Sequence, residues 1–190
     1  YDENPSTPTA NTVTGTNSAA IGSNITVSGN ASFAAGVGAT ATGYSSFGFG
    51  DGADATNSHT VAIGGGGVQA SGAQAIAIGY GSDATNTDAH AFGRNALASG
   101  GSSTALGRDS IASATESIAL GTGRASGTES VAIGIGINST TFGTSATYGI
   151  AIGRTSRAHG SKAIAIGSGG ANSSGANTIS IGQNHTSSSS

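Results

Sequence analysis

The sequence predicts an all-β protein, a β-solenoid of about twelve coils with roughly 14 residues in each. Three observations predict this fold: glycines at a regular spacing, alternating apolar residues before each of them, and a composition dominated by small residues. Of the 190 residues 34 are Gly, 8% are charged, and none is Trp, Met or Cys. That composition argues against a conventional globular core, and a net charge of -3 with 35% apolar residues is not typical of a disordered chain.

The period is set by the glycines that close an alternating apolar pentapeptide, such as AIAIG at 75–79. These closing glycines are Gly22, Gly36, Gly50, Gly64, Gly79, Gly93, Gly107, Gly121, Gly134, Gly153, Gly167 and Gly182. Seven of the eleven gaps between them are 14 residues and three differ from 14 by one residue, so the sequence is a repeat.

Each repeat predicts two short strands. Large apolar residues lie three and one positions before the closing glycine, as Ile76 and Ile78 do, and alternation of this kind is typical of a strand with one buried face. We therefore expect Ile76 and Ile78 to fill the roll. A second alternation of small residues three and five positions after the glycine, as at Ala39 and Ala41, predicts a second strand with small inward residues.

Gly or Asn stands about seven residues after most closing glycines, as at Gly72 and Asn86. Both residues accept a left-handed backbone, so this column predicts a turn with positive φ.

The position between the two large apolar residues is small in every repeat. We expect this alanine column to face outward, where a flat surface lets another backbone pack closely, so the column predicts an oligomer interface. The alternative is that alanine is only tolerated there. The column includes Ala62, Ala77, Ala91, Ala105, Ala119, Ala132, Ala151 and Ala165.

Several segments resemble the head domain of YadA-type trimeric autotransporter adhesins, among them SIALGTG (117–123), ESVAIGIGINS (129–139) and KAIAIGSGG (162–170). The resemblance covers roughly residues 17–183. It implies a left-handed parallel β-roll, a side-by-side homotrimer, and a non-enzymatic adhesive head on a bacterial surface fibre. It also implies an extracellular position at the cell surface, anchored through other segments. No neck, stalk or anchor pattern is present, so we expect an isolated head or a head-like module of another fibre.

Three segments depart from the repeat. We expect residues 1–16 to form an N-terminal cap or linker, residues 135–149 to form a protruding loop, and residues 184–190 to form a polar tail.

Catalytic and metal-binding patterns do not converge in the sequence. The four histidines, His59, His90, His159 and His185, lie in different coils without ligand-like spacing. The paired carboxylates Asp51/Asp54 and Asp83/Asp88 fall at turn positions without a calcium-roll signature. We therefore expect no enzymatic activity, cofactor, metal or nucleic-acid partner, and no direct membrane insertion of this segment.

Charged residues are distributed unevenly along the sequence. Residues 1–93 hold six acids and no Lys or Arg, whereas all six basic residues lie within 94–162. An anionic glycan or an acidic matrix protein could contact such residues, and the alternative is a solvated edge column. The candidate ligand-facing residues are Arg94, Arg108, Arg154, Arg157, Lys162 and Tyr80.

The leading functional hypothesis is an adhesive head that binds a host matrix protein or surface glycan. The alternative is a structural or receptor-binding module of another trimeric fibre, such as a phage tail fibre or an extracellular filament. A row of Ser and Thr before the predicted turn, as at Thr42 and Thr56, raises ice binding as a remote third hypothesis. Turn capping explains that row better, because the neighbouring row is irregular.

Overall fold

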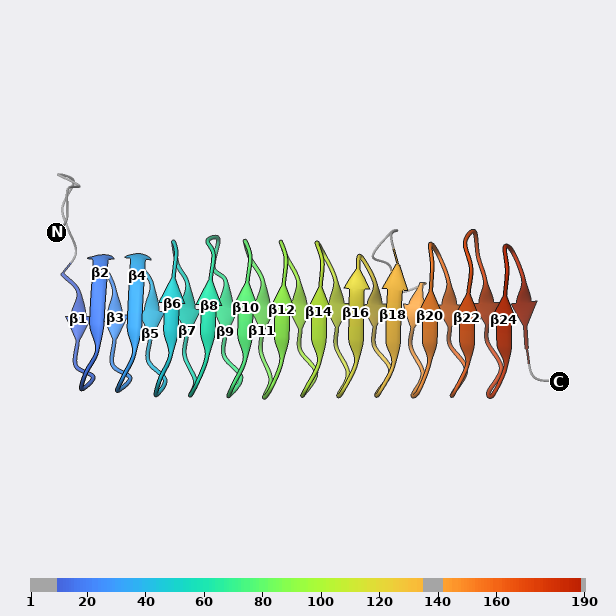
Figure 1. Ribbon diagram of the computed structural model, residues 1–190, viewed down its shortest axis with the longest axis horizontal. Helices are drawn as coiled ribbons and strands as arrows, with labels where there is room; N and C mark the ends of the chain where they lie inside the picture. The colour runs from blue at the N-terminus through green and yellow to red at the C-terminus, as the bar shows by residue number, and fades with distance from the viewer. Residues whose placement is uncertain (1–9, 135–141, 189–190) are drawn as a thin grey trace. The chain divides into compact units, whose positions relative to one another are not determined.

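The computed structural model describes residues 10–134 and 142–188. The secondary structure of the described residues consists of strands, turns and bends, and the chain divides into two compact units, Tyr1–Asn95 and Ala96–Ser190. Each unit is a parallel β-solenoid in which two sheets run through successive coils, and the two units together have about twelve turns (Figure 1). The predicted all-β parallel solenoid is confirmed.

In the first unit, one sheet contains the longer strands and the other contains two-residue strands; we call them the long-strand sheet and the short-strand sheet. The long strands are β2 (Ala19–Ser23), β4 (Phe33–Val37), β6 (Phe47–Phe49), β8 (Val61–Ile63), β10 (Ile76–Ile78) and β12 (His90–Phe92). The short strands are β1 (Thr12–Val13), β3 (Thr26–Val27), β5 (Thr40–Ala41), β7 (Asp54–Ala55), β9 (Gln69–Ala70) and β11 (Asp83–Ala84).

The second unit repeats this arrangement. Its long strands are β14 (Thr104–Leu106), β16 (Ile118–Gly121), β18 (Val131–Gly134), β20 (Ile150–Ile152), β22 (Ile164–Ile166) and β24 (Ile179–Ile181). Its short strands are β13 (Leu97–Ala98), β15 (Ile111–Ala112), β17 (Arg124–Ala125), β19 (Gly143–Thr144), β21 (Arg157–Ala158), β23 (Asn172–Ser173) and β25 (Thr186–Ser187).

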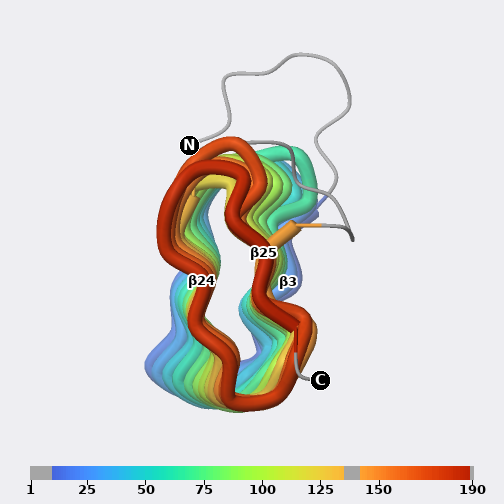
Figure 2. Tube along the Cα trace, turned by 90° about the vertical axis from the view of Figure 1, so that its right-hand side faces the viewer, coloured from blue at the N-terminus to red at the C-terminus, as the bar shows by residue number. Residues whose placement is uncertain are grey.

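Strand pairing keeps the repeat in register. Ile76 lies opposite Val61 on one side and His90 on the other, and Ala77 lies opposite Ala62 and Ala91 in the same way. Each strand of a coil therefore bonds to its equivalent in the next coil, while the two strands of one coil face each other. Figure 2 shows β24 and β25 facing each other across the interior of their coil.

The interior of the roll contains small side chains, and this corrects two expectations. The eight alanines predicted as an outward interface column are at most 3% exposed and line the interior. Ile76 and Ile78, expected to fill the roll, instead point to the outside and are half-buried. The predicted small residues of the second strand, such as Ala39 and Ala41, do face the interior.

The physical reason is the small separation of the two sheets. At Gly48, which takes the alanine position in β6, an added Cβ would lie 2.7 Å from the carbonyl oxygen of Thr40 on the opposite strand. There is no space for a branched side chain in such an interior, because interiors are close-packed and extra methylene groups force strain. Large apolar residues are therefore left on the outer face of the long-strand sheet.

Buried serines complete the interior without leaving their hydroxyl groups unpaired. Ser103 donates to the carbonyl oxygen of Gly100 at 2.7 Å, and Ser46 donates to that of Gly43 at 2.8 Å. A buried hydroxyl is tolerated because its hydrogen bond replaces the one it made to water.

Glycine is required in two columns of the repeat, for a different reason in each. Gly79, a closing glycine, has φ 136°, and an added Cβ would lie 2.4 Å from the carbonyl oxygen of Gly93. The turn column was predicted to have positive φ, but Gly72 does not; its glycine is needed because a Cβ would lie 1.9 Å from the carbonyl oxygen of Asn86. The positive φ falls two residues later, as at Gln74 with φ 61°.

The regular pairing reaches further than residues 17–183. β1 pairs with β3 inside the predicted N-terminal cap, and β25 pairs with β23 inside the predicted tail. Of the predicted loop 135–149, residues 135–141 lie outside the described residues. Residues 143–149 follow the repeat instead, because β19 pairs with β17 and β21.

Candidate interaction surface

The outer face of the long-strand sheet is apolar in the first unit. Phe33, Phe47 and Phe49 form a continuous group of rings, with centroids 5.4 Å apart for Phe33 and Phe47 and 6.4 Å apart for Phe47 and Phe49. Phe49 is 51% exposed and Ile21 is 60% exposed. His90 interrupts this aliphatic and aromatic surface, with its ring 6.3 Å from that of Phe92.

The same face is aliphatic in the second unit. Leu106, Ile118, Ile133, Ile179 and Ile181 are exposed, and Ile181 reaches 64%. A groove of about 540 Å³ lies along this face, lined by Leu120, Ile133, Ile152 and the neighbouring closing glycines, with Arg154 at its margin. The glycines leave the groove open because they carry no side chain.

We call these two surfaces the apolar face of each unit. Contiguous exposed apolar residues on a soluble protein mark interaction sites. Full burial of an exposed isoleucine contributes about 1.5–3 kcal/mol, and each isoleucine there would contribute the share that belongs to its exposed part. The apolar face can therefore supply the binding energy for a protein partner.

Tyr80 and Arg94 lie together at the closing-glycine turn of the first unit. The amide of Asn95 donates to the carbonyl oxygen of Tyr80 at 2.9 Å, so the two turns are in adjacent coils. Tyr80 is 63% exposed and its ring packs over Gly66, where an added Cβ would lie 2.5 Å from the ring. Both side chains are accessible to a ligand.

The basic candidates of the second unit point in different directions. Arg108 forms an exposed ion pair with its neighbour Asp109, with Nε 3.2 Å from Oδ2. Arg154 borders the groove, and Lys162 lies at the opposite turn of the same coil with φ 57°. Thus the structure does not gather Arg108, Arg154 and Lys162 into one site.

Arg157 lies on the outer face of the short-strand sheet in the second unit. Its guanidinium carbon is 4.7 Å from the ring centroid of Phe142, which is a cation–π contact. Its Nε is buried and has no hydrogen-bond partner within the described residues. Burial and the adjacent Arg157 guanidinium lower the pKa of His159, two residues further along the chain, below its usual value.

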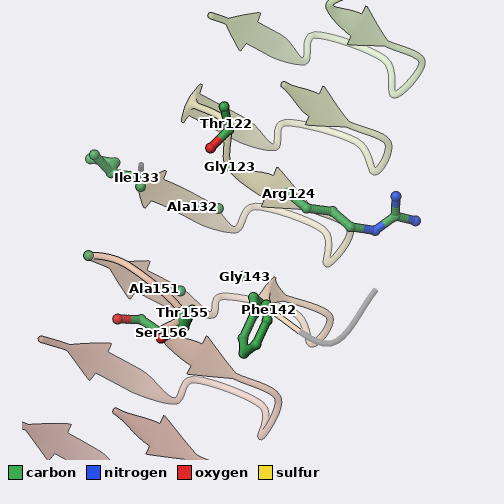
Figure 3. A pocket seen from close by; sticks show the side chains of 12 residues that line it. Thr122, Gly123, Arg124, Ala132, Ile133, Phe142, Gly143, Ala151, Thr155 and Ser156 are labelled. Carbon is green, nitrogen blue, oxygen red and sulfur yellow. The ribbon is translucent and has the colours of Figure 1, made fainter. Parts of the chain in front are cut away.

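A small cavity of about 30 Å³ lies near this position, lined by Ala132, Ala151 and Ser156 among others (Figure 3). Its volume suits a water molecule rather than a substrate.

Within residues 10–134 and 142–188, no group of three or more His, Asp or Glu side chains could hold a metal ion. In the first unit, partial burial raises the pKa of Asp83 above its usual value.

Hydroxyl groups of the Ser and Thr row bond to the backbone of the next coil. Ser126 donates to the carbonyl oxygen of Thr144 at 2.9 Å, and Thr42 donates to that of Thr56 at 3.4 Å. These bonds join successive coils, so they differ from the capping within one turn that was expected from the sequence.

The comparison with protein families matches the repeats. Residues 70–96, 98–123 and 145–169 match the family described as YadA head domain repeat (2 copies). These matches support a YadA-like head domain. No curated protein matches the chain.

The structure brings together residues that the sequence did not single out. Arg124 and Phe142 were not among the candidates; Phe142 contacts Arg157, and Arg124 lies in the same column as Arg157, two coils away. The apolar face was also missed, because its residues were assigned to the interior. The signal that the sequence did offer was side-chain size. Each coil of about 14 residues has four repeating positions with small residues and only two with large residues. The part of the head domain that the structure describes contains no helix able to cross a membrane.

Proposed function

We propose that this chain is the non-enzymatic adhesive head of a trimeric fibre on a bacterial cell surface, and that it binds a host matrix protein or a surface glycan. The YadA-like repeats support an extracellular adhesin-like head. The observation that carries the proposal is the apolar face, because contiguous exposed apolar residues mark a surface that a partner covers.

Three copies of the chain would cover this face by packing side by side. The face repeats large side chains in most coils, and identical copies can match such a regular pattern. The interface is thus formed by the large apolar columns, and the alanine column provides the interior of each roll. Tyr80 and Arg94 of the first unit are exposed on the single chain, and we expect them to stay available for ligands.

Adhesion tests this function directly. Beads coated with the full chain should bind to surfaces carrying matrix proteins or surface glycans and should not bind to albumin-coated surfaces. A matched variant, Tyr80→Ser with Arg94→Ser, should weaken binding without changing the unfolding temperature. Equal binding to albumin, or to no coated surface at all, would overturn the adhesive function.

A further inference from the structure

The outer face of the short-strand sheet carries two carboxylates in the first unit. Asp54 and Asp83 both lie opposite Gln69, one on each side of it, so they share one column and are two coils apart. Two coil steps of about 4.8 Å separate their Cα atoms by about 10 Å. Both side chains are partly exposed, and neither forms an ion pair within residues 10–134 and 142–188. We call them the acidic pair.

The same face carries two arginines in the second unit. Ala125 lies opposite Thr144, which puts Arg124 opposite Gly143, and Gly143 lies opposite Arg157 in the next coil. Arg124 and Arg157 are therefore also two coils apart, with their Cα atoms separated by about 10 Å. We call them the basic pair.

The charged ends of the basic pair are placed to meet a partner that lies flat against this face. The Arg124 side chain extends away from the strands (Figure 3). Among the described residues, Nε is the only nitrogen of Arg157 that is buried without a partner, so its two Nη groups remain at the surface. Residues 130–190 contain no Asp or Glu, so the following coils offer Arg157 no carboxylate.

The two pairs match in charge and in spacing. When one such face contacts the other, each carboxylate can meet one guanidinium group, and the equal separation lets both ion pairs form together. The wider charge distribution favours the same contact, because residues 1–93 hold six acids and no Lys or Arg, whereas all six basic residues lie within 94–162. Opposite charges attract the unlike segments of two copies, and like charges repel the like segments.

We infer that two copies of this chain bind each other through the short-strand sheet, with the acidic pair of one copy against the basic pair of the other. The contact leaves the apolar face free, because the two sheets lie on opposite sides of the roll, as β24 and β25 do in Figure 2. It therefore joins copies that are already packed through their apolar faces. It goes beyond the adhesive function, since it needs no host ligand.

Sedimentation of the full chain at low and high salt tests the contact. The wild type should form larger particles at about 0.01 M salt than at about 1 M salt, where charge pairs are screened. Asp54→Asn with Asp83→Asn, and Arg124→Gln with Arg157→Gln, should each weaken this low-salt association by about tenfold. The mass at high salt should stay unchanged in both variants, because it reports on the apolar face alone.

A mixture of the two double variants provides the sharpest test. One variant keeps the acidic pair and the other keeps the basic pair, so the mixture should recover the low-salt association that neither shows alone. Asp51→Asn with Asp88→Asn, and Arg108→Gln with Lys162→Gln, are the matched controls. They remove the same charge from exposed turn positions outside this face and should change the affinity by less than about twofold.

Three results would overturn the contact: a wild type without salt-dependent association, a mixture that stays dissociated, or control variants that lose as much affinity as the pair variants. Arg124 lies outside the cation–π contact between Arg157 and Phe142. Arg124→Gln alone therefore keeps the test valid if Arg157→Gln destabilises the fold, and it should weaken the association by about threefold.

This contact and the adhesive function fail in different ways. A chain that adheres to matrix proteins but shows no low-salt association keeps the adhesive function and loses the contact. A chain that associates through the two pairs but adheres to no coated surface keeps the contact and loses the adhesive function.

Discussion

At the residue scale, the alanine in the middle of each long strand sets the thickness of the roll. Ala77 is fully buried between Ile76 and Ile78, which face outward, and its methyl group lies between two closely spaced sheets. Ser180 takes the same position in β24, where its hydroxyl donates to the carbonyl oxygen of His185 at 2.7 Å. Small size, rather than hydrophobicity alone, is what this position requires.

We expect Ala77→Leu to destabilise the fold, because added methylene groups in a close-packed interior cost about 1–3 kcal/mol. Ile78→Leu, one residue away on the outer face, is the control and should change the stability by less than about 0.5 kcal/mol. Urea unfolding followed by circular dichroism gives both values. Equal stabilities for the two variants would mean that the alanine column faces outward after all.

Asp83 provides a test that depends on pH. Burial raises its pKa in the folded state above the ordinary value of 3.8, so its contribution to folding is favourable at low pH and is lost as the pH rises through the folded pKa. Asp83→Asn should therefore unfold at a higher temperature than the wild type at pH 7 and at the same temperature at pH 3.

Asp54→Asn is the matched control for this pH experiment. Asp54 lies in the same column, two coils away across Gln69. If both variants gain the same stability at pH 7, the burial of Asp83 is not the cause.

At the residue scale, the sequence did not predict which side chains of the long strands face the interior. A period-two alternation shows where a strand lies. It does not show which of the two alternating sets of side chains faces the interior. Assigning Ile76 and Ile78 to the interior was reasonable for a wide core and wrong for a coil whose opposite strands leave no space beyond a methyl group. The width of a coil depends on how its turns close, and the glycines alone do not determine that.

At the element scale, coils differ in length, so counting along the sequence does not show which residues lie opposite each other in adjacent coils. Arg124 lies three residues after its closing glycine and Arg157 lies four residues after its own, so counting along the sequence puts them in different columns. Strand pairing shows that they share one column, because the coil after Gly121 is shortened by one residue in its turn. Phe142 lies in the expanded repeat, where no counting rule applied. The Arg124–Phe142–Arg157 group could therefore not be predicted.

The two faces of the second unit allow a matched test of the apolar face. Ile150 and Ile111 are both half-buried isoleucines on outer faces, one on the long-strand sheet and the other on the short-strand sheet. Ile150→Asn should weaken self-association, since covering the exposed part of Ile150 contributes a share of the roughly 1.5–3 kcal/mol of full burial in each of the three copies of a trimer. Ile111→Asn should leave self-association unchanged.

Sedimentation at several protein concentrations distinguishes these variants. Dissociation of the Ile111→Asn variant with no change in Ile150→Asn would place the interface on the short-strand sheet instead.

At the scale of the whole molecule, the repeat made the fold class predictable. A 14-residue period with two alternations was enough to predict a parallel solenoid and the positions of nearly every strand. The left-handed twist and the three-chain assembly remain predictions from the family resemblance. A single coil buries too little apolar surface to be stable alone, so stacking between coils must supply the remainder.

The native mass of the full chain tests the central claim that copies of the chain cover the apolar face. Mass measurement in native buffer at micromolar concentration should give about three times the 17.9 kDa mass of one chain. The Ile150→Asn variant should shift that population toward the single chain. A stable wild-type monomer with its apolar face open to water would contradict the account.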